Sequence, residues 1–511
     1  MKIYRLFVTA VLFGFMACNC TEDGNGNLTP DNPDVEDKDV VAYVTTADAK
    51  SLFKKSTFAF TDTNVLPSYN VRYDKNAKLQ QIDGFGLAVT TATCYNLMKM
   101  KPEDRTAFLK QTFSKTEGIG SSLIRVSIGA SDFCISDEYT WCDKEGLENF
   151  VVHAEDRDFL FPVLKEIYAI NPDVKIIASP WSCPKWMKCR MPGGNDWDYS
   201  KFNVSVTDET TYDSWTGGRL KPSCYRTYAD YFVKWVKTME AEGFDIFALT
   251  MQNEPLNPGN SMSLVMPWQD QKEFVKVLGP AMEEAGLGDV QLLLFDHNYN
   301  YDDKAGQDNY PLNIYADPEA YRWADGSAWH SYGGSVTELD EIQAANPEKS
   351  IYFTEASIGE WNYTFDGCLI NDFSSIFLGT MSRGGSGVTL WNLMLDDKKG
   401  PHSRHDGACT TCFGGVTIKS SDYKTITRNS HWYNVAHASA VVKPGARMIE
   451  TSGYEFPAGL ECQMFVNPDG TIGVLLLNRN ADVKPLVFIN DTFTVKYTVP
   501  AKSLASLIWQ E

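Results

Sequence analysis

The chain of 511 residues is long enough for more than one domain, and its balance of 43% hydrophobic and 22% charged residues is that of an ordinary globular protein. Its 46 basic and 66 acidic residues give a net charge of -20, which argues against nucleic-acid binding, because such binding depends on neutralising phosphates with Lys and Arg. The same charge disfavours an anionic polymer as ligand.

The first residues have the pattern of a secretory signal. Lys2 and Arg5 form a basic start, and residues 6–17 are apolar but too few to cross a bilayer. The segment Phe15-Met16-Ala17-Cys18 resembles the cleavage box of bacterial lipoproteins. We therefore expect residues 1–17 to be a signal peptide and Cys18 to become the lipidated N-terminus. The alternative is a plain signal peptide with incidental cysteines.

The segment after the signal is rich in Asn, Asp, Glu, Gly and Pro and has few large apolar side chains. It cannot bury a core, so residues 18–42 are predicted to form a flexible acidic tether. An acidic stretch directly after the cysteine resembles the surface-export signal of some bacterial lipoproteins. We expect an exported lipoprotein of the outer membrane, held by its lipid anchor and facing either the cell surface or the periplasm.

Eight apolar runs of strand length recur along the middle of the chain, with helical patterns between them. Several are nearly continuous in Val, Ile, Leu, Phe and Ala, as is typical of parallel strands buried on both faces. Residues 228–242 and 271–285 are two of the amphipathic helices expected between them. Eight βα units predict an α/β fold of the (β/α)8 TIM-barrel type over residues 81–429, with strands in the runs 81–90, 121–129, 175–182, 247–255, 291–298, 326–332, 350–357 and 387–395.

The two flanks of the barrel have a different pattern. Residues 43–80 contain short alternating runs, and residues 430–511 contain strands separated by turns such as Asn467-Pro468-Asp469-Gly470. These flanks are predicted to form together one β-sandwich domain attached to the barrel.

Two glutamates end apolar strand-like runs. Glu254 lies near the end of the fourth run and Glu355 near the end of the seventh. Function in a barrel collects at the carboxyl ends of the strands, so the two carboxylates should meet at one mouth. A retaining glycosidase needs such a pair, one carboxyl to protonate the leaving oxygen and the other to attack the anomeric carbon. Taken alone, either residue could be a solvated loop glutamate.

Other polar and aromatic side chains fall at the same ends of the runs. No cluster has the spacing of a metal site, and no glycine-rich phosphate loop occurs, so neither a metal nor a cofactor is expected. The candidate substrate-binding residues at these ends are Arg125, Asp132, Trp181, Asn253, His330, Tyr332 and Trp391.

The chain has 12 cysteines, ten of them after the tether. In an oxidising compartment they can form disulfides, for example between Cys134 and Cys142 or between Cys183 and Cys189. Cys409 and Cys412 form a C-x-x-C pair, for which a local disulfide or free thiols are favoured over a metal site.

These motifs together resemble glycoside hydrolase family 30, the family of glucosylceramidases and microbial β-1,6-glucanases. The resemblance covers nearly all of the mature chain, and its six motifs occur in barrel order. They are QIDGFG from Gln81, IRVSIG from Ile124 followed by Ser131-Asp132-Phe133, ASPWSCPKW from Ala178, QNEP from Gln252, TEAS from Thr354 and LWNL from Leu390.

The resemblance implies roles for these residues. The family carries its acid/base on strand four and its nucleophile on strand seven, which are the positions of Glu254 and Glu355. Asn253 is then placed to hydrogen-bond the sugar 2-hydroxyl, although it could simply close the turn before Pro255. Arg125 is expected to pair with Glu355 and keep it ionised, either as part of the site or as a buried structural salt bridge.

The remaining candidates are weighed in the same way. Asp132, Trp181 and Trp391 resemble the family positions that grip the terminal glucose, with packing as a rival explanation for Trp181. Tyr332 is expected to hydrogen-bond the nucleophile. His330 is either a structural histidine or a direct contact.

The sequence thus predicts a retaining β-glycoside hydrolase acting on a β-glucan through a glycosyl-enzyme intermediate, with an endo-β-1,6-glucanase as the leading interpretation. The alternatives are a β-glucosidase or glucosylceramidase that acts from chain ends, a β-xylanase, and a surface glycan-binding lipoprotein without catalysis. The partner is a β-linked glucan or glucoside. The oligomeric state is left open, with a monomer as the expectation.

Overall fold

The computed structural model describes residues 39–60, 69–299, 301, 304–453, 456–490 and 494–511. The predicted signal peptide, Cys18 and most of the predicted tether lie outside the described residues. The tether was expected to reach residue 42, but β1 (Val40–Thr46) already begins at Val40. The reason is burial: Val40 and Ala42 have no exposed surface, and β1 pairs on both sides with other strands.

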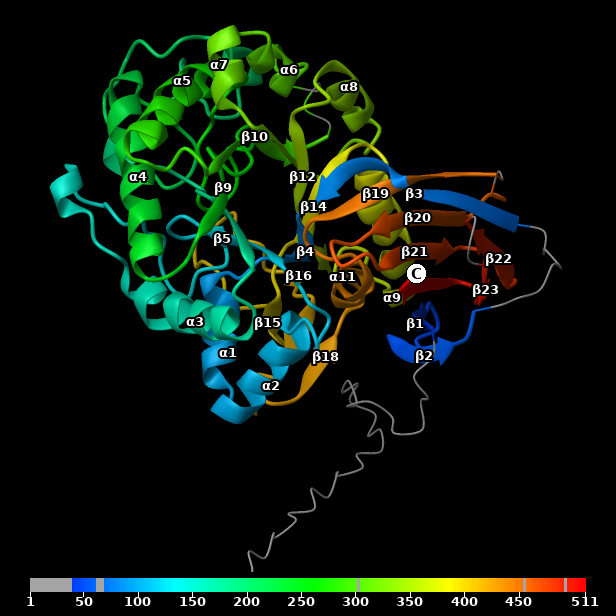
Figure 1. Ribbon diagram of the computed structural model, residues 1–511. Helices are drawn as coiled ribbons and strands as arrows, with labels where there is room; N and C mark the ends of the chain where they lie inside the picture. The colour runs from blue at the N-terminus through cyan, green and yellow to red at the C-terminus, as the bar shows by residue number, and fades with distance from the viewer. Residues whose placement is uncertain (1–38, 61–68, 300, 302–303, 454–455, 491–493) are drawn as a thin grey trace, which may run out of the picture.

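The predicted barrel is confirmed. Eight parallel strands form one sheet, surrounded by helices in Figure 1. The sheet closes through a parallel bridge between Ala88 and Arg125, where the backbone N–H of Val89 donates to the Arg125 carbonyl at 2.8 Å. In sheet order the strands are β4 (Gly84–Leu87), β14 (Gly385–Leu390), β12 (Ser350–Glu355), β11 (Gly326–His330), β10 (Gln291–Asn298), β9 (Ile246–Thr250), β6 (Lys175–Ser179) and β5 (Leu123–Ser127).

Each predicted strand run overlaps one of these strands, but the first run is divided. Residues 81 and 82 end β3 (Tyr69–Ile82) of the second domain, and the barrel strand β4 starts after Asp83. Gly84 has a φ of +145°, a conformation that favours glycine, so the chain can turn sharply here. The carboxylate of Asp83 fixes the turn, because Lys175 and the Tyr352 hydroxyl both donate to it at 2.6 Å.

The helices pack around the outside of the barrel that these eight strands form. In α4 the predicted stripe from Tyr228 to Met239 faces the barrel and is buried, which explains why this face is aromatic and aliphatic. Within the described residues, no helix combines the length and apolarity needed to cross a membrane. The helices are α1 (Thr91–Lys99), α2 (Pro102–Phe113), α3 (Phe161–Ile170), α4 (Tyr225–Ala241), α5 (Trp268–Glu284), α6 (Tyr310–Tyr315), α7 (Pro318–Trp323), α8 (Glu338–Ala345), α9 (Phe365–Asp372), α10 (Gly379–Met381) and α11 (Ser430–Val441).

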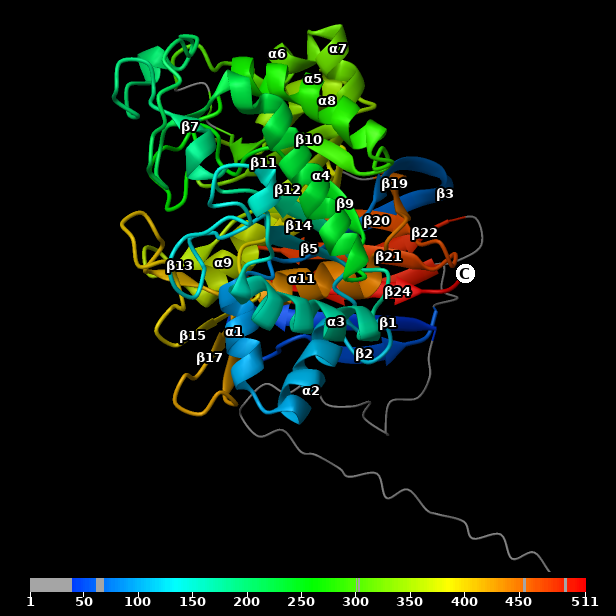
Figure 2. The same ribbon diagram turned by 90° about the vertical axis from the view of Figure 1, so that its left-hand side faces the viewer.

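The second domain is the predicted β-sandwich, built from both ends of the chain. Blue N-terminal and red C-terminal strands lie side by side in Figures 1 and 2, in a nine-stranded arrangement with its own buried core. Helix α11 joins the domains, since His437 lies 2.7 Å from Ser506 and 2.8 Å from Thr45. Besides β1 and β3, the strands are β2 (Lys54–Phe58), β19 (Ala446–Ser452), β20 (Leu460–Val466), β21 (Ile472–Asn478), β22 (Lys484–Ile489), β23 (Thr494–Val499) and β24 (Ser503–Trp509).

Short strands stiffen the loops at the mouth of the barrel, and Figure 2 shows the loops with β7, β13 and β15 along one side of the molecule. The pairs β7–β8 and β13–β16 are antiparallel, and β13–β16 joins the loop after β12 to the loop after β14. These strands are β7 (Lys188–Cys189), β8 (Arg219–Leu220), β13 (Ile358–Gly359), β15 (Met394–Asp396), β16 (Cys412–Phe413), β17 (Val416–Ile418) and β18 (Ile426–Arg428).

The C-x-x-C pair forms the predicted local disulfide, between Cys409 and Cys412, and Cys412 is the first residue of β16. The two other suggested pairings are wrong: Cys134, Cys142, Cys183 and Cys189 are all buried free thiols. Three of these thiols, those of Cys134, Cys142 and Cys189, donate to backbone carbonyls in place of forming disulfides.

Candidate active site

The two glutamates meet at the mouth of the barrel. Glu355 is the last residue of β12, and Glu254 follows β9 with a φ of +46°, held by a hydrogen bond from its backbone N–H to the Asp296 carbonyl at 2.9 Å. Each is 6% exposed. An oxygen of one carboxylate lies within 4.8 Å of an oxygen of the other. This spacing is that of retaining glycosidases, since inverting enzymes separate the pair by roughly 6.5–9.5 Å to admit a water.

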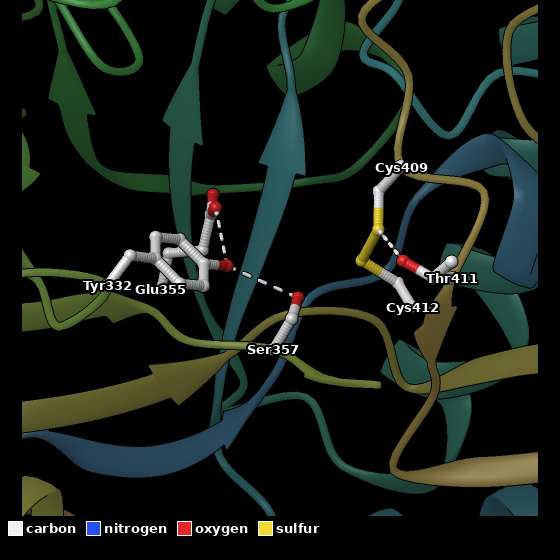
Figure 3. The surroundings of a disulfide bond; sticks show 6 residues. All are labelled: Tyr332, Glu355, Ser357, Cys409, Thr411 and Cys412. Atoms are coloured by element: carbon white, nitrogen blue, oxygen red, sulfur yellow. Dashed lines mark hydrogen bonds between the residues drawn. A yellow bond between two sulfur atoms is a disulfide. The ribbon is translucent and has the colours of Figure 1, made fainter. Parts of the chain in front are cut away.

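Glu355 is held from two sides. Nη1 of Arg125 lies 2.5 Å from Oε2, and the hydroxyl of Tyr332 lies 3.0 Å from Oε1. Figure 3 shows this hydroxyl between Glu355 and Ser357, whose Oγ lies 3.2 Å from it. The carboxylate is thereby fixed in direction while the ring of Tyr332 remains at the rim of the mouth.

Glu254 has different partners. The side-chain amides of Asn257 and Asn260 donate to Oε2 at 2.8 and 2.6 Å. On the other oxygen, Oε1, His330 Nδ1 lies at 3.5 Å and His297 Nε2 at 4.0 Å. The Glu355 carboxylate therefore faces a permanent cation, whereas the Glu254 carboxylate faces amides and titratable imidazoles.

Asp296 is the central carboxylate that the sequence analysis missed. It is fully buried, and Oδ2 accepts from Arg125, Ser179 and Thr250 at 2.8, 3.0 and 2.6 Å. Oδ1 accepts from Thr354 at 2.7 Å and lies 3.0 Å from His330 Nε2. Burial opposes its ionisation, but Arg125 and His330 outweigh burial and hold the pKa of Asp296 well below its ordinary value.

Glu254 and His330 titrate as a pair. Burial opposes charge on both, yet the hydrogen bond and charge of His330 lower the pKa of Glu254 to about 2, and the charges and hydrogen bonds of Glu355, Asp296 and Glu254 raise the pKa of His330 to about 9. Between these values the pair holds one proton. Nε2 of His330 is directed to Asp296, and its Nδ1 faces Oε1 of Glu254 at 3.5 Å and Oε1 of Glu355 at 4.0 Å.

The pKa of Glu355 moves in the opposite direction. Burial raises it, and the charge of Glu254 adds to this, while His330 and Arg125 act against both. The charges of His330 and of Arg125, whose guanidinium lies 2.5 Å away, favour the ionised form of this buried carboxylate.

Trp181 and Trp391 form a wall behind Arg125. Their rings stack with centroids 4.9 Å apart, and the guanidinium carbon lies 4.9 Å from one ring and 5.4 Å from the other. Both side chains are at most 2% exposed, so they act first by shaping the cation's environment. Asn253 completes the wall, because its Oδ1 accepts from Arg125 Nη2 at 2.8 Å.

Asp132 lies on the other side of the mouth, in the loop after β5. Burial raises its pKa well above the ordinary value, with the charges of Glu355 and Glu254 adding to this and a hydrogen bond from the Cys409 backbone acting against it. The backbone of Ser403 also donates to the Asp132 carbonyl at 2.7 Å. The disulfide-containing loop thus supports this residue directly.

The nine barrel residues selected from the sequence therefore converge on one site, whereas Cys18 lies outside the described residues. Sequence reasoning missed Asp296, His297, Asn257 and Asn260. Asp296 and His297 had a signal, since they are polar residues at the end of the apolar fifth run. The two asparagines lie in an irregular loop and had none.

Among the described residues, Glu254, His330 and Glu355 bring ligand-type atoms close enough for a metal ion. Their atoms are already engaged, however, by Arg125 and by the two asparagines on Glu254. Hydrogen bonding therefore accounts for the arrangement.

A (β/α)8 barrel with two buried carboxylates at this spacing on its fourth and seventh strands defines a glycoside hydrolase of the retaining type. The chain belongs to glycosyl hydrolase family 30: residues 82–442 match the TIM-barrel domain of that family and residues 445–507 match its beta sandwich domain.

The chain is similar to several proteins with known names. Its fold matches that of the endo-beta1,6-glucanase BT3312 with a TM-score of 0.87 and 47% identity, over 93% of this chain and 100% of that one. It is 30% identical to endo-1,6-beta-D-glucanase neg1 of Aspergillus fumigatus, over 78% of each chain. It is 26% identical to lysosomal acid glucosylceramidase of Mus musculus, over 85% of this chain and 82% of that one.

Proposed function

We propose that this protein is an endo-β-1,6-glucanase that cleaves its substrate with retention of configuration. The close approach of Glu254 and Glu355 carries the chemistry. The linkage is supported by the likeness along nearly the whole chain to a glucanase with that name. The more distant likeness to a glucosylceramidase makes an exo-acting β-glucosidase the second candidate.

In the first step Glu355 attacks the anomeric carbon as a carboxylate. The bond from this carbon to the bridging oxygen breaks, and Glu254 gives its proton to the departing oxygen. Arg125 and Tyr332 hold the attacking carboxylate in line. The product is an ester between Glu355 and the sugar.

In the second step Glu254 removes a proton from water, whose oxygen attacks the same carbon. The ester bond breaks, Glu355 leaves as a carboxylate, and two inversions give net retention. The sugar is released with a free reducing end.

The Glu254–His330 pair supplies the acid's proton in this scheme. The negative charge of Glu355 is among the effects that raise the pKa of His330. When Glu355 becomes an ester, this charge disappears and the imidazole binds its proton less tightly. The pair, which gave up its proton in the first step, is therefore kept deprotonated, so that Glu254 is present as the carboxylate that the second step needs as its base.

Product analysis on β-1,6-glucan, laminarin, xylan and an aryl β-glucoside tests the proposed function. We expect β-1,6-linked oligosaccharides of several lengths to appear early from β-1,6-glucan, with little action on xylan. Glucose as the sole product from every substrate would contradict endo action. Faster cleavage of laminarin or xylan would contradict the proposed linkage.

We also propose that the chain is exported as a lipoprotein anchored through Cys18. The support is the basic start, the short apolar segment and the cleavage-box resemblance that ends at this cysteine. Fractionation of the native host tests this: the wild type should be found with membranes, and a Cys18→Ala variant should not. Equal distribution of the two would contradict lipid anchoring.

A further inference from the structure

Exposed aromatic side chains gather at the mouth of the barrel. Among the large hydrophobic side chains of the described residues, three aromatic ones are clearly exposed: Trp197 at 58%, Tyr332 at 46% and Trp361 at 50%. They lie in the loops after β6, β11 and β12 respectively. Exposed rings beside a catalytic site are candidates for contact with a ligand.

Trp197 is positioned by the loop that carries the acid/base. A Cβ added at Gly259 would lie 2.7 Å from Cη2 of the tryptophan ring, so glycine is what lets the ring lie against this backbone. Gly259 sits between Asn257 and Asn260, the two residues that donate to Oε2 of Glu254. The ring is therefore fixed relative to the group that protonates the leaving oxygen.

A cavity of about 170 Å³ opens in the same region. Asn257 and His297 line it and also flank Glu254, and Asn298, Tyr199 and Lys304 are among its other lining residues. The Lys304 ammonium lies 4.7 Å from the centre of the Tyr199 ring. The space is large enough for several waters, which the hydroxyls of a sugar can replace.

The lining has the character of a sugar site. It combines aromatic rings and a leucine with amide, imidazole and ammonium groups, and none of the described residues that line it is a carboxylate. Such a mixture suits an uncharged ligand with many hydroxyls, which stacks on a ring and hydrogen-bonds at its edges.

The position of the cavity indicates on which side of the scissile bond a bound sugar would lie. Trp181 and Trp391, in the loops after the third and eighth strands, pack against Arg125, which holds the attacking carboxylate. The cavity instead lies beyond Glu254, between loops of the third, fourth and fifth strands. The acid/base contacts the leaving oxygen, so a ligand beyond it belongs to the leaving group.

We propose that Trp197 and this cavity form the leaving-group subsite, which binds the glucosyl residues on the reducing-end side of the bond to be cleaved. This assignment rests on the proposed glucanase function. In transfer reactions the same subsite binds an acceptor: a sugar hydroxyl gives its proton to Glu254, its oxygen bonds to the anomeric carbon, and Glu355 is released as a carboxylate.

The test compares two leaving groups in three variants. Trp197→Ala and Lys304→Met alter the subsite, while Val483→Ala truncates an exposed residue of the sandwich domain and serves as the matched control. For each protein, kcat/KM is measured on a β-1,6-linked glucohexaose and on an aryl β-glucoside, whose small leaving group does not reach the ring. Transfer to gentiobiose is measured alongside.

We expect Trp197→Ala to lower kcat/KM on the hexaose by about 10-fold or more, corresponding to a lost stacking contact. Its activity on the aryl glucoside should stay within about two-fold of wild type, and its transfer products should decrease. Lys304→Met should act in the same direction, and Val483→Ala should change neither substrate.

Failure of the subsite assignment and failure of the proposed linkage give different results. Equal losses on polymer and aryl substrates, or no loss on either, contradict the leaving-group subsite. If the wild-type protein cleaves another β-glucan in preference to the β-1,6-linked one, the proposed linkage is wrong. The same comparison, made on oligosaccharides of the preferred glucan, then decides the subsite independently.

Discussion

Replacing Asp296 by Asn should move the alkaline limit of activity. The substitution keeps the shape of the side chain but removes the charge that faces His330 Nε2 at 3.0 Å. A hydrogen bond to a charged group is worth about 1.5–3 kcal/mol, and one pKa unit corresponds to about 1.4 kcal/mol. The pKa of His330, which is about 9 in the intact site, should therefore fall by about one to two units.

The direction of the shift in the pH profile follows from the protonation state that the catalytic groups need for activity. The first step needs a proton on the Glu254–His330 pair, so activity is present below its pKa and is lost as the pH rises through it. The first step also needs ionised Glu355, whose raised pKa sets the acidic limit, below which activity is lost. A profile of kcat/KM against pH on an aryl β-glucoside should thus narrow from its alkaline side in the variant.

Stability provides a second readout. Asp296 is also paired with Arg125 at 2.8 Å in a fully buried position, and breaking such a pair costs about 3–5 kcal/mol. Thr354→Val is the matched control, because it removes a hydrogen bond to the same carboxylate without changing its charge. An alkaline limit in Asp296→Asn that equals the limit in this control would refute the assigned proton pair.

Three further outcomes follow from the site. Glu355→Gln should abolish hydrolysis of every substrate, and hydrolysis of a β-glucoside at the wild-type rate by this variant would contradict the role of Glu355 as nucleophile. Glu254→Gln should lower hydrolysis of the polymer by about 10²–10⁴-fold. Aryl glucosides with acidic leaving groups need less help from the acid, so on these substrates the glycosyl-enzyme should form at a rate much closer to that of the wild type. Pre-steady-state kinetics measures this rate. Replacing Cys409 and Cys412 by Ser should raise KM for glucan about 2- to 10-fold with less effect on kcat, because the Cys409 backbone supports Asp132; an unchanged KM would show that the loop holds its position without the disulfide.

The barrel could be predicted because its strands are buried on both faces. Buried parallel strands appear in a sequence as continuous apolar runs, so all eight could be located and counted. That count alone placed Glu254 and Glu355 on the fourth and seventh strands. Arg125 and Trp391 followed from the same rule, since function collects at strand ends.

The direction of the Asp296 side chain could not be predicted from the apolar run that contains this residue. The register shifts between Phe295 and His297, and Phe295 and Asp296 both have a positive φ, of 72° and 70°. This bulge interrupts the alternation of side chains and directs the carboxylate to the centre of the mouth. Periodicity carries no information about such an insertion.

The errors at the cysteines and at the tether have a common cause. Closeness in sequence suggested pairs such as Cys134 with Cys142, yet these thiols are buried and unbonded. The acidic composition before residue 40 suggested a tether that continued further, but strand pairing with β24 orders Val40. Tertiary contacts decided both cases, and local composition does not report them.

The stereochemistry of the first product tests the central claim most directly. Hydrolysis of β-1,6-glucan is followed by proton NMR in the first minutes, before the released reducing ends equilibrate. Two carboxylates within 4.8 Å predict that the new reducing ends of oligosaccharides appear first as the β-anomer. Initial release of the α-anomer would contradict the double displacement through Glu355 and Glu254.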